Sequence, residues 1–328
     1  MKNCTKFVVL LLAVCMLAAV MTGCGSKKES VLIYTSAEDY RVEDMTKRLA
    51  EKFPNYDITI EYMSTGNHAA KLLAEGVDTE CDITHDLEYG YLYKLDQQGV
   101  FASISDIDQS VYCDDVVESE NYVVEVRNGG AIILNTEVLA QKGLEEPTSY
   151  EDLLKPEYKG LISMPNPKAS GTGYMFLKSL VNAWGEEEAF AYFDELTPNV
   201  LQYTSSGSGP VNALIQGEAA IGLGMTAPAV TQINDNVPLK IVYFEEGSPF
   251  SLYGQAIISG KETRECVKEV FDFLVNTYNY EVNEKFFPEQ IFKDTVFSIE
   301  NYPQNIVYSD MSNNTVEEKE RLLAMWKY

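Results

Sequence analysis

Histidine, tryptophan and basic residues are scarce in this 328-residue chain. It contains 2 His and 2 Trp, and its 25 Lys and Arg are outnumbered by 50 Asp and Glu, which gives a formal net charge of −25. A surface this acidic repels nucleic acid, so we expect no nucleic-acid partner. Zinc is also disfavoured, because His68 and His85 are the only imidazoles and no cysteines stand at metal-ligand spacing.

The signatures of common catalytic sites are missing as well. The chain has neither a Gly-x-Ser-x-Gly elbow nor a Gly-x4-Gly-Lys-Ser/Thr loop. His85, Asp86 and Glu88 could assist acid–base chemistry, but such a trio is also an ordinary helix start with a capping acid. We therefore expect a protein that is not an enzyme and that needs no cofactor and no resident metal.

What the chain does have, at its beginning, is the composition of an export signal. Lys2 and Lys6 precede an apolar run over residues 7–21. The run is shorter than a comfortable membrane span, and a charged start followed by a short apolar stretch is typical of a secretory signal.

The end of this signal resembles a bacterial lipoprotein cleavage box, with Gly23 directly before Cys24 and Met21 where leucine is commoner. The resemblance implies a signal peptide over residues 1–23, cleavage before Cys24 and a lipid on the Cys24 thiol. Residues 24–30 then form a flexible, lipid-anchored tether. An uncleaved anchor is the alternative, and it would also put the protein on the outer face of a membrane.

The first part of the chain alternates strand and helix patterns. Buried-strand patterns lie at residues 31–34, 57–63 and 81–84, and helix starts follow at residues 35–38, 64–67 and 85–86. This alternation predicts a parallel sheet with helices on both faces. Ligands in such sheets bind at the carboxyl ends of the strands.

From Tyr122 the pattern changes to two strand-like runs, 122–127 and 131–135, around Gly129-Gly130. We interpret this change as a crossing into a second lobe with β/α units of its own. The further strands are expected at 161–164, 201–203, 219–225, 240–244 and 252–259, and the last helices at 267–277, 281–287 and 316–326.

Four of the strand-to-helix junctions are rich in hydroxyl groups or glycine. They are Thr35-Ser36, Ser64-Thr65-Gly66, residues 169–173 and residues 204–209. The first backbone N–H groups of a helix are unpaired and carry partial positive charge, so they attract anions. Serine and threonine are also ordinary helix caps, but their repetition in both halves favours one shared anion-binding pocket.

The order of these motifs resembles that of bacterial extracellular solute-binding proteins. The resemblance is carried by residues 31–36, 64–66, 81–83, 134–136, 147–156, 166–173 and 217–222. It implies an α/β fold of the two-lobed periplasmic-binding-protein type II. Each lobe would be a mainly parallel sheet flanked by helices, with the ligand cleft between the lobes. Residues 31–127 plus about 253–290 would form the N-terminal lobe, and 128–252 plus about 291–328 the C-terminal lobe.

The same resemblance implies a receptor that delivers a small solute to the permease and ATPase of an ABC importer. The protein would act as a monomer outside the cytoplasm, held at the outer face of the cell membrane by the lipid on Cys24. Members of this subgroup bind ferric iron, 2-aminoethylphosphonate, sugar phosphates or thiamine.

One departure bears on the ligand. Ferric-iron members carry a tyrosine pair just after the strand that matches residues 217–222, and residues 224–229 contain no tyrosine. Ferric iron needs several anionic oxygen ligands, which hydroxyl and backbone groups do not supply. We therefore expect an anionic solute, either a phosphonate such as 2-aminoethylphosphonate or an organophosphate such as a sugar phosphate. Ferric iron is the alternative, and a secreted phosphoester hydrolase with His85 as its base is a lesser one.

The candidate ligand contacts are hydroxyl and N–H donors for the anion and polar groups for the rest of the solute. The donors for the anion are expected at Thr35, Ser36, Ser64, Thr65, Gly66, Ser170, Gly171, Thr172, Ser205, Ser206 and Ser208. The remaining part of the solute is expected to contact His85, Asp86, Glu88 or Thr226.

Overall fold

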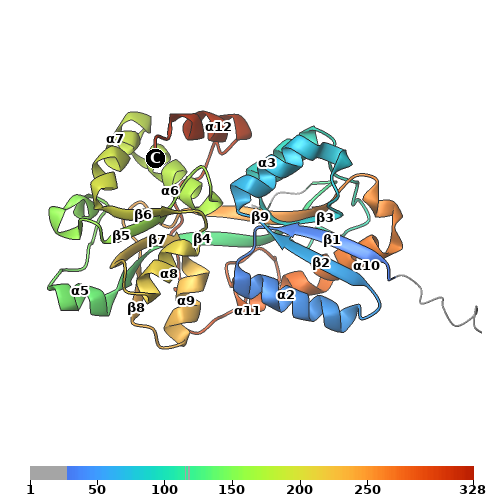
Figure 1. Cartoon of the computed structure of the whole chain (residues 1–328), viewed down its shortest axis with the longest axis horizontal. Helices are drawn as coiled ribbons and strands as arrows, with labels where there is room; N and C mark the ends of the chain where they lie inside the picture. Colours follow the sequence, from blue (N-terminus) through green and yellow to red (C-terminus); the bar gives the residue numbers. More distant parts are fainter. Residues whose placement is uncertain (1–27, 115, 117–118) are drawn as a thin grey trace, which may run out of the picture.

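The computed structural model describes residues 28–114, 116 and 119–328, which form two halves joined through a central sheet (Figure 1). The strand order is β2-β1-β3-β9-β4-β7-β5-β6, and β8 pairs with β4. Parallel strands lie in both halves, and the antiparallel strands β9 and β4 lie between them. This arrangement confirms the predicted two-lobed α/β architecture.

The first half is a parallel three-stranded unit with its helices. Its elements are β1 (Ser30–Thr35), α2 (Asp39–Lys52), β2 (Asp57–Tyr62), α3 (Thr65–Glu75), β3 (Ile83–Glu88) and α4 (Tyr89–Gln97). Helix α2 shows how its sequence fixes its place, because Met45 and Leu49 are spaced one turn apart and both are buried. Asp39 in the first turn and Lys52 in the last suit the helix dipole.

Strand β4 (Val123–Asn135) runs through both halves, and its neighbour β9 (Phe250–Ile257) crosses beside it between them (Figure 1). The first part of β4 pairs with β9, and the part from Gly130 onward pairs with β7 and β8. The two strand-like runs expected around Gly129-Gly130 are therefore one uninterrupted strand. The glycines make room and do not form a turn: a Cβ on Gly129 would lie 2.5 Å from a carboxylate oxygen of Glu289, and one on Gly130 would lie 2.9 Å from Met175.

The third helix begins later than expected. The sequence places its start at His85, but β3 continues to Glu88 and α4 begins at Tyr89. The reason is tertiary, because Leu87 and Glu88 pair with Gly254 and Tyr253 of β9, more than 160 positions away. A local pattern cannot report such a partner.

The second half repeats the strand–helix alternation. Its elements are α5 (Thr136–Lys142), β5 (Ile162–Pro165), α6 (Gly171–Trp184), α7 (Glu186–Leu196), β6 (Val200–Thr204), α8 (Gly209–Ile215), β7 (Ile221–Met225), α9 (Thr226–Asn234) and β8 (Leu239–Val242). Short 3₁₀ turns lie at Gly76–Asp78, Glu151–Leu154, Pro156–Tyr158, Thr197–Asn199 and Lys261–Thr263.

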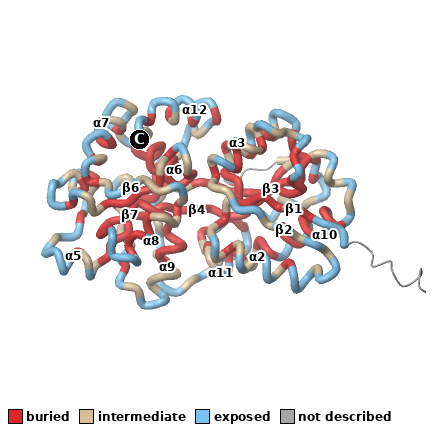
Figure 2. The backbone as a smooth tube through the Cα atoms, viewed as in Figure 1, coloured by how far each residue is buried: buried red, intermediate tan, exposed pale blue. Residues whose placement is uncertain are grey.

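The C-terminal helices return to both halves. Helix α10 (Glu265–Phe273), a π-helical turn (Leu274–Tyr278) and α11 (Asn279–Lys285) belong to the core of the first half. Helix α12 (Val316–Met325) lies over the second half, where Leu322 and Trp326 join its core (Figure 1). Figure 2 shows the buried residues concentrated along the strands and on the inner faces of the helices.

The predicted signal peptide and the lipid-bearing Cys24 lie outside the described residues. Within the part of the chain that the structure describes, no helix has the length and apolar character to cross a membrane. The residue boundaries assigned to the two lobes stay a prediction.

His68 contributes acid-sensitive stability to the first half. It is buried in α3, and its Nε2 lies 3.0 Å from Thr84 Oγ1. Burial, and after it the charge of His85, lowers the pKa of His68 from 6.5 to about 3. The unfolded chain takes up a proton at this imidazole below pH 6.5, whereas the folded chain does so only near pH 3. The contribution is therefore present above pH 6.5 and is lost as the pH falls.

We predict that His68→Gln, which keeps a polar group near Thr84, makes the protein less sensitive to acid. Between pH 7 and pH 5 the unfolding free energy of the wild type should fall by about 2 kcal/mol more than that of the variant. Urea titrations followed by circular dichroism at the two pH values measure the difference. Equal losses in both proteins would contradict a neutral, buried imidazole.

Candidate functional site

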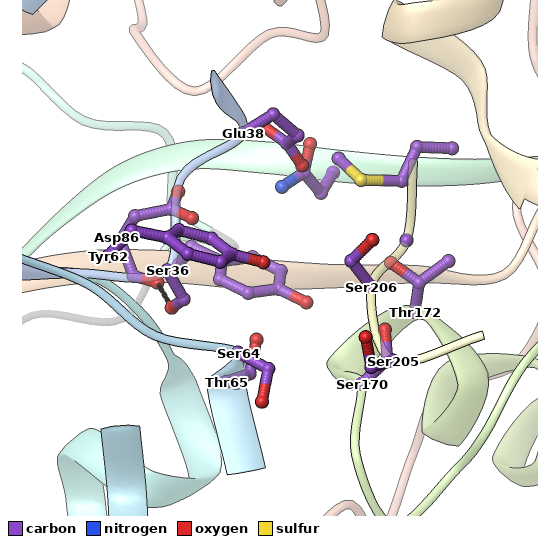
Figure 3. A pocket seen from close by; sticks show the side chains of 14 residues that line it. Ser36, Glu38, Tyr62, Ser64, Thr65, Asp86, Ser170, Thr172, Ser205 and Ser206 are labelled. Atoms are coloured by element: carbon purple, nitrogen blue, oxygen red, sulfur yellow. Dashed lines mark hydrogen bonds between the residues drawn. The ribbon is translucent and has the colours of Figure 1, made fainter. Parts of the chain in front are cut away.

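A polar pocket lies between the two halves (Figure 3). Its lining is drawn from strand ends, helix starts and the crossing strands of both halves. The lining residues are Ser36, Glu38, Tyr62, Ser64, Thr65, Asp86, Asn128, Ser170, Thr172, Ser205, Ser206, Gly207, Met225 and Tyr253.

Two helices direct their N-termini at this pocket. Ser64 precedes α3 and Ser170 precedes α6, and both have the extended backbone of an N-cap residue. Neither hydroxyl makes a capping hydrogen bond to a described residue, so both remain available to a ligand. Figure 3 shows Ser64 and Thr65 facing Ser170 and Thr172 across the pocket. The partial positive charge of two helix starts makes this part of the pocket suited to an oxyanion.

The loop after β6 adds Ser205 and Ser206 beside the start of α6 (Figure 3). Gly207 follows them and is packed tightly. A Cβ there would lie 2.2 Å from Thr172 Oγ1 and 2.7 Å from the sulfur of Met225. The glycine therefore lets the loop backbone approach the α6 start closely.

The two halves touch directly at one edge of the pocket. The N–H of Gly66 donates to the carbonyl oxygen of Ala169 at 3.4 Å. A Cβ on Gly66 would lie only 2.7 Å from the carbonyl oxygen of Lys168. This contact brings the starts of α3 and α6 together and requires glycine at position 66.

Asp86 reaches the pocket because β3 is irregular there. Its φ is 52°, in the left-handed region that residues other than glycine rarely adopt, and the register of β3 against β9 shifts between Thr84 and Leu87. A bulge of this kind redirects a side chain. In this case it turns the Asp86 carboxylate toward the pocket and toward Arg41.

A buried charge network centred on Arg41 of α2 holds that carboxylate. Arg41 is 1% exposed, and its Nη1 lies 2.7 Å from Asp86 Oδ1 and 3.4 Å from Glu38 Oε2. Its Nη2 lies 2.6 Å from Glu125 Oε1, and His85 Nε2 lies 3.2 Å from Glu125 Oε2. One guanidinium thus contacts three carboxylates from three different segments of the chain.

Burial and charge act in opposite directions on these acids. Burial raises the pKa of Asp86 well above its ordinary value, against the opposing charge of Arg41. Burial acts on Glu125 in the same sense, but the charges of His85 and Arg41 outweigh it, so the pKa of Glu125 is lowered. Arg41 is the buried counter-charge of both acids: it helps to lower the pKa of Glu125 and opposes the rise in the pKa of Asp86.

Two of the predicted ligand contacts have protein partners instead. His85 is 1% exposed, with its Nδ1 3.0 Å from Thr35 Oγ1 and its Nε2 against Glu125. Glu88 accepts a hydrogen bond from Ser251 at 3.0 Å and pairs with Lys319 of α12. Neither lines the pocket, and their role as ligand contacts stays a prediction.

The structure brings together eight of the fifteen predicted contact residues. These are Ser36, Ser64, Thr65, Asp86, Ser170, Thr172, Ser205 and Ser206. Besides His85 and Glu88, five predicted residues do not line the pocket: Thr35, Gly66, Gly171, Ser208 and Thr226. Thr35 is fully buried and accepts from the N–H of Ala37, and Thr226 is fully buried at the start of α9.

Sequence reasoning missed six lining residues. They are Glu38, Tyr62, Asn128, Gly207, Met225 and Tyr253. Glu38 carried a usable signal, because it belongs to the helix start at residues 35–38. Asn128 and Tyr253 carried none, since they lie inside β4 and β9 and reach the pocket only through the crossing of these strands.

The charge of the lining is one-sided. Among the described residues that line it, Glu38 and Asp86 are acids and none is lysine or arginine. No group of three or more His, Cys, Asp or Glu side chains in the described ranges is placed to hold a metal ion. Burial, and after it the charge of Glu88, raises the pKa of Tyr253 well above its ordinary value.

The comparisons with known proteins agree on one family. Residues 83–289 match the family described as bacterial extracellular solute-binding protein. An uncharacterized protein of Haemophilus influenzae is 30% identical over 274 residues, which is 80% of this chain and 77% of that protein. The spermidine/putrescine-binding periplasmic protein of Escherichia coli is 26% identical over 193 residues. That match covers 57% of this chain and about half (53%) of the relative.

Solved structures agree in fold. The periplasmic binding protein AfuA from Actinobacillus pleuropneumoniae, with exogenous fructose-6-phosphate bound, has a TM-score of 0.79 and 25% identity. The match covers 92% of this chain and 98% of AfuA. Iron-bound HitA from Pseudomonas aeruginosa has a TM-score of 0.74 and 16% identity, over 90% of this chain and 99% of HitA, a likeness of fold alone.

We predict that Arg41→Met lowers the unfolding free energy by about 3–5 kcal/mol, because it leaves Asp86 and Glu125 buried without their cation. Arg48→Met is the matched control on the same helix, where the side chain is 32% exposed and pairs with Glu281. Its expected loss is below about 1 kcal/mol. Urea unfolding at neutral pH compares the two, and similar losses would show that the buried network is not essential.

Proposed function

Because this chain belongs to the bacterial extracellular solute-binding proteins, we propose that its pocket captures a small phosphonate or phosphorylated solute for an ABC importer. The family places the protein outside the cytoplasm as a substrate-binding component. The observation that carries the proposal is the pair of uncapped serines, Ser64 and Ser170, at two helix N-termini that face one pocket from opposite halves.

A tetrahedral oxyanion suits this arrangement. Its oxygens accept hydrogen bonds from the first N–H groups of α3 and α6 and from the hydroxyls of Thr65, Thr172, Ser205 and Ser206. Hydrogen bonds to a charged group contribute more than neutral ones, about 1.5–3 kcal/mol each. The Asp86 carboxylate on the other side accepts from a hydroxyl or amine of the same solute.

Capture works by a hinge. Strands β4 and β9 cross between the halves, so bending them separates the halves and opens the pocket, while closure restores the Gly66–Ala169 contact. The closed, loaded protein then docks on the permease, whose ATPase drives import. A lipid on Cys24 keeps the receptor near that permease, and it acts as a monomer.

Calorimetric titration of the mature protein tests the ligand class. The panel is 2-aminoethylphosphonate, fructose 6-phosphate, ferric citrate and putrescine. Binding of either phosphorus compound supports the proposal. Tight iron binding with a visible tyrosinate band, or binding of putrescine alone, would overturn it and assign the pocket to a cation.

We predict that Ser170→Ala weakens binding of the phosphorus compound about tenfold or more, because one hydroxyl donor to a charged group is lost. Ser179→Ala is the matched control: it is equally buried on α6, but its hydroxyl donates to the carbonyl oxygen of Phe176 and does not line the pocket. Calorimetry of both variants separates a pocket effect from a helix effect. An unchanged affinity in Ser170→Ala would remove this hydroxyl from the site.

We predict that Gly66→Ala impairs closure, because its Cβ would meet the carbonyl oxygen of Lys168 at 2.7 Å. Affinity should fall about tenfold, the equivalent of 1.4 kcal/mol, with no loss of unfolding free energy. Ala74→Val, at an exposed position of the same helix, should bind like the wild type. Small-angle scattering with and without ligand measures the compaction, and full compaction of Gly66→Ala would contradict the closure contact.

A further inference from the structure

The pocket has two chemically different sides. Hydroxyl donors line it from both halves, at Ser36, Ser64 and Thr65 and, facing them, at Ser170, Thr172, Ser205 and Ser206. The acids Glu38 and Asp86 come from the first half alone (Figure 3). An oxyanion held by the donors of the second half therefore has carboxylates on the other side of the pocket. What the acids bind must be something other than the oxyanion.

The protein supplies one shared cation for these acids. Arg41 is the cation that contacts them, and it is shared among Asp86, Glu125 and Glu38. Glu38 has the longest of these contacts, 3.4 Å, and no described lysine or arginine lines the pocket to compensate it. The Glu38 side therefore carries excess negative charge.

The pKa of Tyr62 is affected by the same negative charges. Burial, and then the negative charges of Glu38, Asp39 and Asp86, raises the pKa of Tyr62 above its ordinary value. Its ring lines the pocket beside Asp86 (Figure 3), where an aromatic face also attracts a cation.

Asn128 supplies an independent observation. It lies on β4, lines the pocket and is 2% exposed, and its Oδ1 has no hydrogen-bond partner among the described residues. A buried acceptor without a donor costs about 1–3 kcal/mol, so a ligand that brings a donor to this oxygen is favoured.

We infer that Glu38 and Asn128 are specificity-determining residues that select a solute with a cationic donor group at the end opposite its oxyanion. The inference rests on the proposed function, which supplies the oxyanion. A hydroxyl would satisfy Asn128 but leave the Glu38 charge uncompensated, whereas an ammonium satisfies both. The ligand class is thus an amino-substituted phosphonate or phosphate, a zwitterion.

Three matched phosphonates test this by calorimetry: 2-aminoethylphosphonate, 2-hydroxyethylphosphonate and propylphosphonate. They share the oxyanion and differ in the terminal group. The wild type should prefer the amine to the alkyl compound by about tenfold or more, with the hydroxyl compound between them. Equal affinities for the three, or binding of fructose 6-phosphate without the amine, would overturn the inference and leave the proposed function standing.

Variants assign the preference to residues. Glu38→Gln should reduce the amine-to-alkyl ratio about tenfold. Glu61→Gln removes the same charge from an exposed position on β2 and should keep the wild-type ratio. Asn128→Ala should lose affinity for the amine, and Asn128→Asp, which keeps the acceptor, should restore it. An unchanged ratio in Glu38→Gln overturns the assignment, and binding of no phosphorus compound at all overturns both proposals.

Discussion

The guanidinium of Arg41 is the interaction on which the site depends, because it joins α2, β3 and β4 in one buried network. Its partners Asp86 and Glu125 come from positions 45 and 84 residues further along the chain. A buried cation without anions, or the reverse, is strongly unfavourable. Arg41 therefore fixes the strand ends that form one side of the pocket, and it stabilises the unusual backbone at Asp86.

The second constraint is that two strands cross between the halves. Because β4 and β9 pair along the boundary, the proposed opening would bend these two strands and would also move Met225, Ala227 and Val230 of the second half, which pack in the core of the first. The contact at the edge of the pocket is weaker than this strand pairing. The N–H of Gly66 donates one long hydrogen bond to Ala169, which is easily broken and remade. A stiff shared sheet and a weak edge contact are what a protein needs to close around a solute and release it.

Local patterns in the sequence were enough for the alternation of strands and helices and for the hydroxyl-rich helix starts. Ser64, Ser170 and Ser206 were found because helix N-termini have a recognisable composition. The predictions differ from the structure where pairing with a distant strand determines the local conformation. His85 looked like a helix start until β9 paired beside it, and Asn128 gave no signal inside a long strand. The bulge that turns Asp86 has no sequence signal either: aspartate adopts the left-handed backbone more readily than most residues, but it is far commoner elsewhere.

The scarcity of lysine and arginine around the pocket bears on how the solute is released. A guanidinium or ammonium would hold a phosphorus oxyanion through its full charge, whereas helix starts and hydroxyls hold it through partial charges. Such groups lose their alignment when the halves open, because α3 and α6 belong to opposite halves. For the proposed phosphorus solute, affinity would therefore be tied to closure, and the carboxylate of Glu38 would add to this by repelling an anion that is no longer enclosed from the other side.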